Sequence, residues 1–224
     1  MLRIARVFAV YARATELVRR RPESIDAHYA LSYVLRFAGL LDEAASECDT
    51  AFMLDPRTQT VGLRSCAFVF LLKGNYTRAM NYVDLDHGSD FAKALSIHML
   101  VRQGKEEEAL KLGAPQIPHW NSFNVLIACM QKRSASDIAP LAAAVKPSGD
   151  PETDYLFATH LAYCGQDQAA IAMLNSAIRG KYCSYPAIDA DPYFSGLRAT
   201  AEYASVRASG LACRDDFLQR IAPR

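Results

Sequence analysis

The five histidines have the most versatile chemistry in this chain, because an imidazole can bind metals and can transfer protons near neutral pH. They are His28, His87, His98, His119 and His160. None forms an H-E-x-x-H pair or accompanies a C-x-x-C pair, and the sequence contains neither G-x-S-x-G nor G-x-x-x-x-G-K-[ST]. We therefore interpret the histidines as groove or packing residues, and we expect no catalytic residue, no metal site and no cofactor.

The segment DLDHGSD partly matches a calcium-binding loop through Asp84, Asp86 and Asp90. An EF-hand loop needs an oxygen ligand at its fifth position and glycine at its sixth, whereas this segment has Gly88 fifth and Ser89 sixth. The simpler prediction is that Ser89 or Asp90 caps the helix that follows. Asp150-Pro151 predicts another helix start in the same way.

Small residues recur at near-regular intervals along the chain. An alanine stands five residues after a glycine or serine in five places, at Gly39 and Ala44, Gly74 and Ala79, Gly104 and Ala109, Ser134 and Ala139, and Gly165 and Ala170. Seven residues before each turn stands a small or apolar residue, at Ser32, Ala67, Ile97, Ile127 and Ala158. The pattern predicts a unit of helix, tight turn and helix, in which glycine ends the first helix and alanine lies where two helices cross.

This pattern resembles the tetratricopeptide-repeat family over most of residues 23–178. The match is carried by Ser32, Gly39, Ala44, Ala51 and Pro56, by Ala67, Gly74, Tyr76 and Ala79, and by Ala158, Gly165, Ala170 and Ala177. The resemblance implies an all-α fold, a right-handed α-solenoid of about five helical hairpins that serves as a protein-binding scaffold. The two middle units depart from the pattern at Ile97, Ile127 and Pro140, and we expect the helix containing Pro140 to begin around Asp137.

Residues 1–22 and 179–224 flank the predicted array. The first segment reads as an Arg-rich docking helix with Ile4, Phe8, Tyr11 and Val18 on its apolar side, and as the second half of a truncated repeat.

The C-terminal segment predicts a helix start at Asp191-Pro192, a short turn to Leu197 and a capping helix from about Ala201 to Ile221, with Tyr203, Val206, Phe217 and Ile221 facing the array. Through Asp191, Pro192, Leu197 and Arg198 it is similar to tails of bacterial repeat proteins attached to kinase, nucleotide-cyclase or winged-helix domains.

Composition and cysteine content limit the function classes. The 224 residues are 51% hydrophobic and 22% charged with a net charge of +1, so nothing demands nucleic acid or an acidic substrate. The longest apolar runs fall short of the roughly 20 residues that a bilayer span needs. The six cysteines form no C-x-x-C pair, and we interpret them as free thiols in a reducing, cytoplasmic setting.

The first helix of each hairpin in such an array lines a concave groove. The expected lining residues are Tyr29, Tyr33, Arg36, Arg64, Phe68, His98, Arg102, Asn124, Lys132, Tyr155, Thr159 and Tyr163. This aromatic and basic lining suits a protein or peptide with an acidic or C-terminal carboxylate group. The alternative for each tyrosine is packing in the seam between helices.

Two functions remain open at this point. The first is a non-catalytic scaffold or sensory signalling region that binds a peptide or a partner domain, without nucleic acid or membrane contact. The second is a self-associating structural fragment of a larger bacterial signalling protein, in which the apolar side of the N-terminal helix would need another copy or an upstream domain to cover it.

Overall fold

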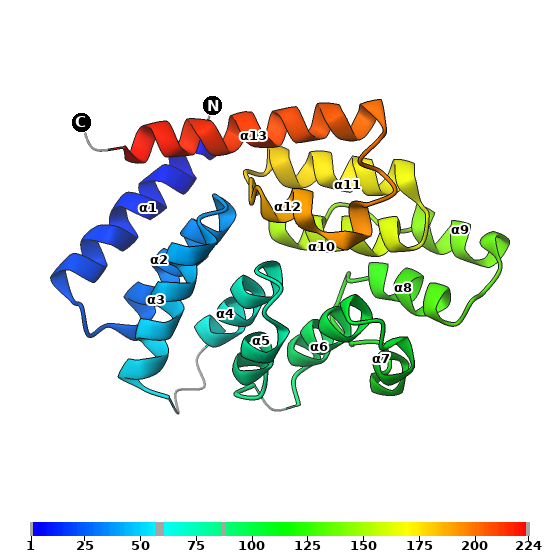
Figure 1. The fold of residues 1–224 in the computed structure, drawn as a ribbon, viewed down its shortest axis with the longest axis horizontal. Helices are drawn as coiled ribbons and strands as arrows, with labels where there is room; N and C mark the ends of the chain where they lie inside the picture. The colour runs from blue at the N-terminus through cyan, green and yellow to red at the C-terminus, as the bar shows by residue number, and fades with distance from the viewer. Residues whose placement is uncertain (1, 57–60, 87, 223–224) are drawn as a thin grey trace. The chain divides into compact units, whose positions relative to one another are not determined.

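The computed structural model describes residues 2–56, 61–86 and 88–222, apart from the side chains of residues 2–6 and 61–64. In these residues the secondary structure consists of thirteen α-helices and one short 3-10 helix, without strands (Figure 1). The predicted all-α class is therefore confirmed. No described helix is both long and apolar enough to cross a membrane.

The chain forms two compact units. Unit 1 comprises Met1–Ser96 and Arg214–Arg224, and unit 2 comprises Ile97–Cys213. The boundaries of these units, after Ser96 and after Cys213, differ from those of the predicted segments 1–22, 23–178 and 179–224. The division into those three segments stays a prediction.

Unit 1 contains two helix pairs preceded by a long helix (Figure 1). Its helices are α1 (Leu2–Arg20), α2 (Ile25–Phe37), α3 (Leu41–Leu54), α4 (Val61–Leu72), α5 (Tyr76–Val83) and the first part of α6 (Asp90–Arg102). Helix α2 packs against α3, and α4 packs against α5. Helix α4 also contacts both α2 and α3, so each hairpin of this unit is packed against the other.

Apolar side chains from the two ends of the chain meet in unit 1. Val34 and Phe217 belong to a buried cluster, and Val7 and Tyr11 of α1 pack against it. The rings of Tyr11 and Phe217 meet edge to face, 5.4 Å apart. The apolar side of α1 is therefore covered within this chain at these residues, which weakens the observation that suggested self-association.

Unit 2 contains the remaining elements, with α10 at the centre of its packing. They are α7 (Glu106–Leu112), α8 (Ser122–Met130), α9 (Ala135–Ala143), α10 (Pro151–Tyr163), α11 (Asp167–Arg179), α12 (Ala187–Ala190), the 3-10 helix η1 (Pro192–Phe194) and most of α13 (Ala201–Ile221). Helix α10 packs against α8, α11 and η1. The bounds of α13 agree with the predicted capping helix.

Five first helices end in the same turn. At Gly39 the backbone has a φ of 76°, Gly39 N–H donates to Arg36 O at 3.0 Å, and Leu40 N–H donates to Leu35 O at 3.0 Å. This bond pair is a Schellman motif, which satisfies carbonyls that the helix end leaves free. The same pair recurs with a positive φ at Gly74, Gly104, Lys132 and Gly165.

The fourth turn lies two residues earlier than its sequence predicts. Lys132 takes the left-handed position with a φ of 56°, and Ser134 is the N-cap of α9. The helix contact lies four residues after the N-cap, as Ala44 does after Leu40, and in α9 this position is Ile138, which is buried, whereas Ala139 is exposed. The prediction for Ala139 is therefore wrong. The equivalent alanines of the other four predicted hairpins are each 0% exposed; they are Ala44, Ala79, Ala109 and Ala170.

Pro140 also differs from its prediction, because α9 begins at Ala135 and not around Asp137. Ser134 Oγ accepts from Asp137 N–H at 3.3 Å and so starts the helix early. Pro140 therefore lies inside α9, where it cannot donate a hydrogen bond to the carbonyl of Ser136. The Pro140 side chain faces outward.

Two predicted helix caps are confirmed. Ser89 Oγ accepts from Ala92 N–H at 3.0 Å at the start of α6. Asp150 Oδ1 accepts from Thr153 N–H at 2.8 Å at the start of α10. His87, which lies between Asp86 and Asp90 in the segment DLDHGSD, is outside the described residues.

The cysteines are paired, and the expectation of free thiols is wrong. The disulfides join Cys48 to Cys66, Cys129 to Cys164, and Cys183 to Cys213, with Cα–Cα distances of 5.7, 5.7 and 5.9 Å. The local sequence pattern around each cysteine gives no information about the neighbouring element that the cysteine faces. Packing between different elements brings the sulfur atoms together.

Candidate functional site

Most of the expected groove residues are buried. Seven of them have buried side chains: Tyr29, Arg36, Phe68, His98, Arg102, Tyr155 and Thr159. The prediction of an exposed lining is wrong for these seven, because a side chain enclosed by its own protein cannot meet a partner there. Of the others, Tyr33, Asn124 and Lys132 are exposed, Tyr163 is half-buried, and the side chain of Arg64 lies outside the described residues.

The predicted residues His98, Arg102 and Tyr155 nevertheless lie close together, and Arg102 and Tyr155 bind a carboxylate. Arg102 Nη2 lies 2.6 Å from Asp191 Oδ2, and both side chains are only 3% exposed. Tyr155 OH donates to the same oxygen at 2.5 Å. Asp191 Oδ1 accepts from Tyr193 N–H at 3.0 Å. The acidic ligand expected for this face is therefore supplied by the chain itself.

Local structure explains how Asp191 reaches this position. Asp191 is the N-cap of η1, where the fixed φ of Pro192 begins the helical turn. Arg198 Nη2 donates to Asp191 O at 2.8 Å and holds the backbone. On the opposite side, Arg102 at the end of α6 lies with its guanidinium 4.3 Å from the centre of the Tyr193 ring. The buried ion pair and the Tyr155 hydrogen bond thus hold Asp191 and the start of η1 against α6 and α10.

A chain of hydrogen bonds continues from Arg102 through two histidines. Arg102 Nη1 lies 3.1 Å from His98 Nδ1, His98 Nε2 lies 3.1 Å from His160 Nε2, and His160 Nδ1 lies 2.9 Å from Ser122 Oγ. A guanidinium only donates, so His98 Nδ1 accepts and His98 carries its proton on Nε2. That proton is donated to His160 Nε2, and His160 in turn donates from Nδ1 to Ser122.

The surroundings keep both histidines neutral. Burial is the main cause that lowers the pKa of His98 well below its usual value, assisted by His160 and by the charge of Arg102. Burial, with the Arg102 charge, lowers the pKa of His160 to about 3. Burial also raises the pKa of Tyr155, and the adjacent Asp191 carboxylate adds to this effect. These directions agree with the proton positions deduced from the hydrogen bonds.

This arrangement is suited to holding a carboxylate and not to activating Ser122. A general base must accept the proton of the serine hydroxyl. His160 already donates to Ser122 Oγ, and both residues are 0% exposed. In the part of the chain that the structure describes, no group of three or more His, Cys, Asp or Glu side chains is placed to hold a metal ion.

Unit 1 brings together a second set of the predicted residues on α2 and α4. Arg36 is 1% exposed, and its Nη1 donates to Ser65 O and Ser65 Oγ, both at 2.5 Å. Its guanidinium lies 5.0 Å from the Tyr33 ring centre and 5.4 Å from that of Phe68. Tyr33 remains 39% exposed and packs on Phe37 with ring centres 4.6 Å apart.

Sequence reasoning missed Asp191, Ser122 and Tyr193 as members of the unit 2 cluster. The sequence identifies Asp191 as a helix start and not as the partner of an arginine, and these two roles use different oxygens of one carboxylate. It lies 89 residues from Arg102 in the sequence. The aspartate-proline pair beside a tyrosine was the available local signal, but it does not indicate which cation it meets.

Comparison with protein-family models, with curated proteins and with solved structures finds no match for this chain.

Proposed function

We propose that the chain is a non-catalytic protein-interaction scaffold, a right-handed α-solenoid of about five tetratricopeptide-like hairpins. The proposal is supported by the Schellman turn that recurs at Gly39, Gly74, Gly104, Lys132 and Gly165. Packing of α2 on α3, α4 on α5, α8 on α9 and α10 on α11 gives the same support. Stacked repeats of this kind present extended surfaces to partners.

The partner in this proposal is a peptide segment that binds at the exposed Tyr33 of unit 1. Tyr33 is 39% exposed, whereas Val34 and Phe37 beside it on α2 are 3% and 6% exposed. A rigid aromatic ring on a buried support is a favourable contact point, because it loses little conformational entropy on binding. The nearby Arg36 charge makes the ring surface more suitable for a segment that carries acidic groups.

Unit 2 supplies the observation that carries the proposal. There the first-helix residues Arg102 and Tyr155 bind the carboxylate of a short segment that starts a helical turn at Asp191. A face of this type is thus chemically able to bind an acidic peptide segment. We infer that the corresponding face of unit 1 binds such a segment from another protein.

Fluorescence anisotropy with short labelled peptides tests this function. The panel pairs acidic peptides, with either a free or an amidated C-terminus, with the same sequences carrying asparagine and glutamine. We expect acidic members to bind, and we expect Tyr33→Ala to weaken binding about 10-fold, the loss typical of an aromatic contact residue.

Met53→Ala is the matched control, because Met53 is 80% exposed on α3, the second helix of the same hairpin. It should leave affinity unchanged. Equal affinity of the acidic peptides for the wild type and the Tyr33→Ala protein, with both proteins folded, would contradict the proposed site.

A further inference from the structure

Each disulfide joins two different elements of one unit. In unit 1, Cys48 on α3 is bonded to Cys66 on α4, which connects the first hairpin to the second. In unit 2, Cys129 on α8 is bonded to Cys164 at the end of α10, which connects the fourth hairpin to the fifth. The last bond joins Cys183, after α11, to Cys213 on α13.

Bonds between neighbours have a particular effect in a stacked array. Each repeat contacts only the adjacent repeats, so cooperativity depends on the interfaces between them. A covalent bond across an interface restricts the unfolded chain and keeps the two hairpins close. The loops closed here span 18, 35 and 30 residues of sequence separation, long enough for a substantial effect.

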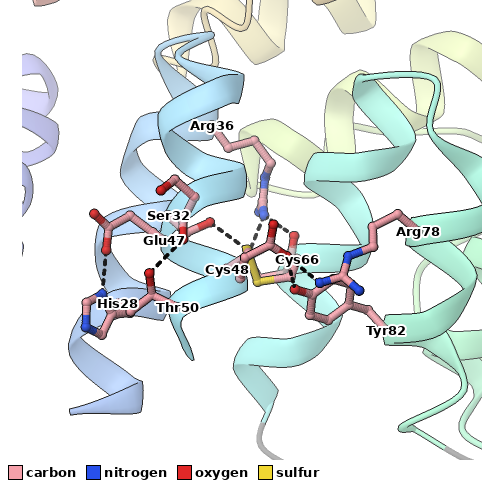
Figure 2. Close-up of a disulfide and its surroundings, with 12 residues drawn as sticks. His28, Ser32, Arg36, Glu47, Cys48, Thr50, Cys66, Arg78 and Tyr82 are labelled. Atoms are coloured by element: carbon pink, nitrogen blue, oxygen red, sulfur yellow. Dashed lines mark hydrogen bonds and ion pairs between the residues drawn. A yellow bond between two sulfur atoms is a disulfide. The ribbon is translucent and has the colours of Figure 1, made fainter. Parts of the chain in front are cut away.

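The surroundings of Cys48 and Cys66 are built around the bonded form (Figure 2). Both residues are 0% exposed. Ser32 Oγ lies 3.0 Å from Cys48 Sγ. A disulfide sulfur carries no proton, so the Ser32 hydroxyl is the donor.

Hydrogen bonds reinforce the same hairpin interface. Asp49 Oδ1 on α3 accepts from Arg78 Nη2 at 2.5 Å and from Tyr82 OH at 3.0 Å on α5. Arg36 of α2 also donates to Ser65 of α4. Two polar contacts therefore connect the same pair of hairpins as the disulfide.

We propose that this protein works in an oxidising compartment and that its three disulfides lock separate elements of the array together. Each bond forms by thiol–disulfide exchange, in which two cysteine thiols lose two protons and two electrons to a disulfide donor that becomes a dithiol. Such bonds persist where the surroundings are oxidising. This inference opposes the cytoplasmic location expected from the sequence, which rested on free thiols.

The proposal gives an order of reduction. Cys129, Cys164 and Cys213 are partly exposed, whereas Cys48 and Cys66 are fully buried. A thiolate must reach a sulfur atom to open a disulfide, so the two bonds of unit 2 should open in the native protein before the bond of unit 1.

Thiol counting tests the pairing directly. Protein exported to the bacterial periplasm and protein kept in the cytosol are acid-quenched, denatured and alkylated with N-ethylmaleimide. For the exported protein we expect no adduct before reduction, six after it, and three linked peptides that match the structure. Different cysteine pairs, or six reactive thiols in an exported protein that is as stable as the oxidised one, would overturn the proposal.

A mutational cycle separates a disulfide from two packed thiols. Cys129→Ala, Cys164→Ala and the double variant should each lower the melting temperature by about 6 to 12 °C, because either change alone removes the bond. Dithiothreitol should lower the melting temperature of the double variant less than that of the wild type, because the double variant has no bond at this position to reduce. Additive losses, together with a wild type insensitive to dithiothreitol, would show that the thiols are unbonded and would contradict the proposal.

Discussion

Unit 1 and unit 2 each bury an arginine on a first helix, and the two arginines hold different parts of the chain. Arg36 donates to Ser65 on the next hairpin, whereas Arg102 pairs with Asp191 in the C-terminal segment. In unit 1 the neighbouring Tyr33 stays exposed; in unit 2 the corresponding surface of α10 is covered by η1. Buried basic residues on such helices can therefore either join repeats or bind a carboxylate.

The largest expected difference concerns the two aspartates that accept from arginine. Asp191→Ala should lower the free energy of unfolding by about 3 to 5 kcal/mol, because it leaves the buried Arg102 charge unpaired. Asp49→Ala removes a partner of Arg78 and the acceptor of Tyr82 OH in unit 1, but the Asp49 side chain is 49% exposed, so a smaller loss of about 1 to 2 kcal/mol is expected. Urea unfolding of both variants measures the contrast.

The double variant Arg102→Met with Asp191→Leu sharpens this test. It replaces the buried ion pair with apolar side chains, and such replacements are often neutral. We expect it to recover most of the stability that Asp191→Ala loses. Similar losses for Asp49→Ala and Asp191→Ala would show that the buried pair has no special role.

The pH dependence of stability should come largely from the histidines of unit 2. The pKa of His160 is about 3 in the folded protein and its ordinary value is 6.5, so between these values the unfolded chain binds more protons. His98 shifts in the same direction. The contribution is complete above about pH 6.5 and is lost as the pH falls, by about 1.4 kcal/mol per pH unit for each histidine.

His160→Gln tests this dependence, because an amide can accept from His98 and donate to Ser122 without titrating. Chemical unfolding at several values between pH 7 and pH 4.5 should show a shallower slope for the variant than for the wild type. An unchanged slope would mean that other groups control acid stability.

The small residues at helix contacts give a contrast between equivalent positions. Ala44→Leu in unit 1 and Ala170→Leu in unit 2 should each cost about 1 to 3 kcal/mol, because both positions are fully buried. Ala139→Leu should have little effect, since Ala139 is exposed. Thermal unfolding measures all three, and equal shifts would contradict the register assigned to the fourth hairpin.

The smallest effect concerns the left-handed turn residues. Lys132→Gly should raise stability by up to about 1 to 2 kcal/mol, because it removes the cost of a side chain at a φ of 56°. Gly74→Ala in unit 1 should lower it by a similar amount through backbone strain alone, since a Cβ there would meet no atom within 4 Å. Melting temperatures that do not move in opposite directions would count against these turn assignments.

The sequence predicts the helices and most turns because these depend on local chemistry. Glycine at a left-handed position and alanine at a crossing leave a periodic signal, as at Gly39 and Ala44. Lys132 gave no such signal, because lysine adopts the left-handed region only at an energetic cost and its presence in a sequence does not indicate that conformation. The fourth turn was therefore placed two residues too late, and its helix contact one residue too late.

The polar cluster and the disulfides could not be predicted in the same way. Arg102 and Asp191 lie 89 residues apart, and each has an ordinary local role at a helix end. The partner of Cys129 depends on how α8 packs against α10, which periodicity does not specify. Residue types on the first helices were sound evidence for carboxylate binding, but they did not reveal that the chain supplies the carboxylate.

Hydrogen exchange with a bound acidic peptide tests the central claim most directly, because it reads α2 of unit 1 and α10 of unit 2 in one experiment. Amides of α2 around Tyr33 should become more protected when the peptide binds, and those of α10 around Tyr155 should not change, because Asp191 already occupies that face. Protection at α10 with none at α2 would contradict the account.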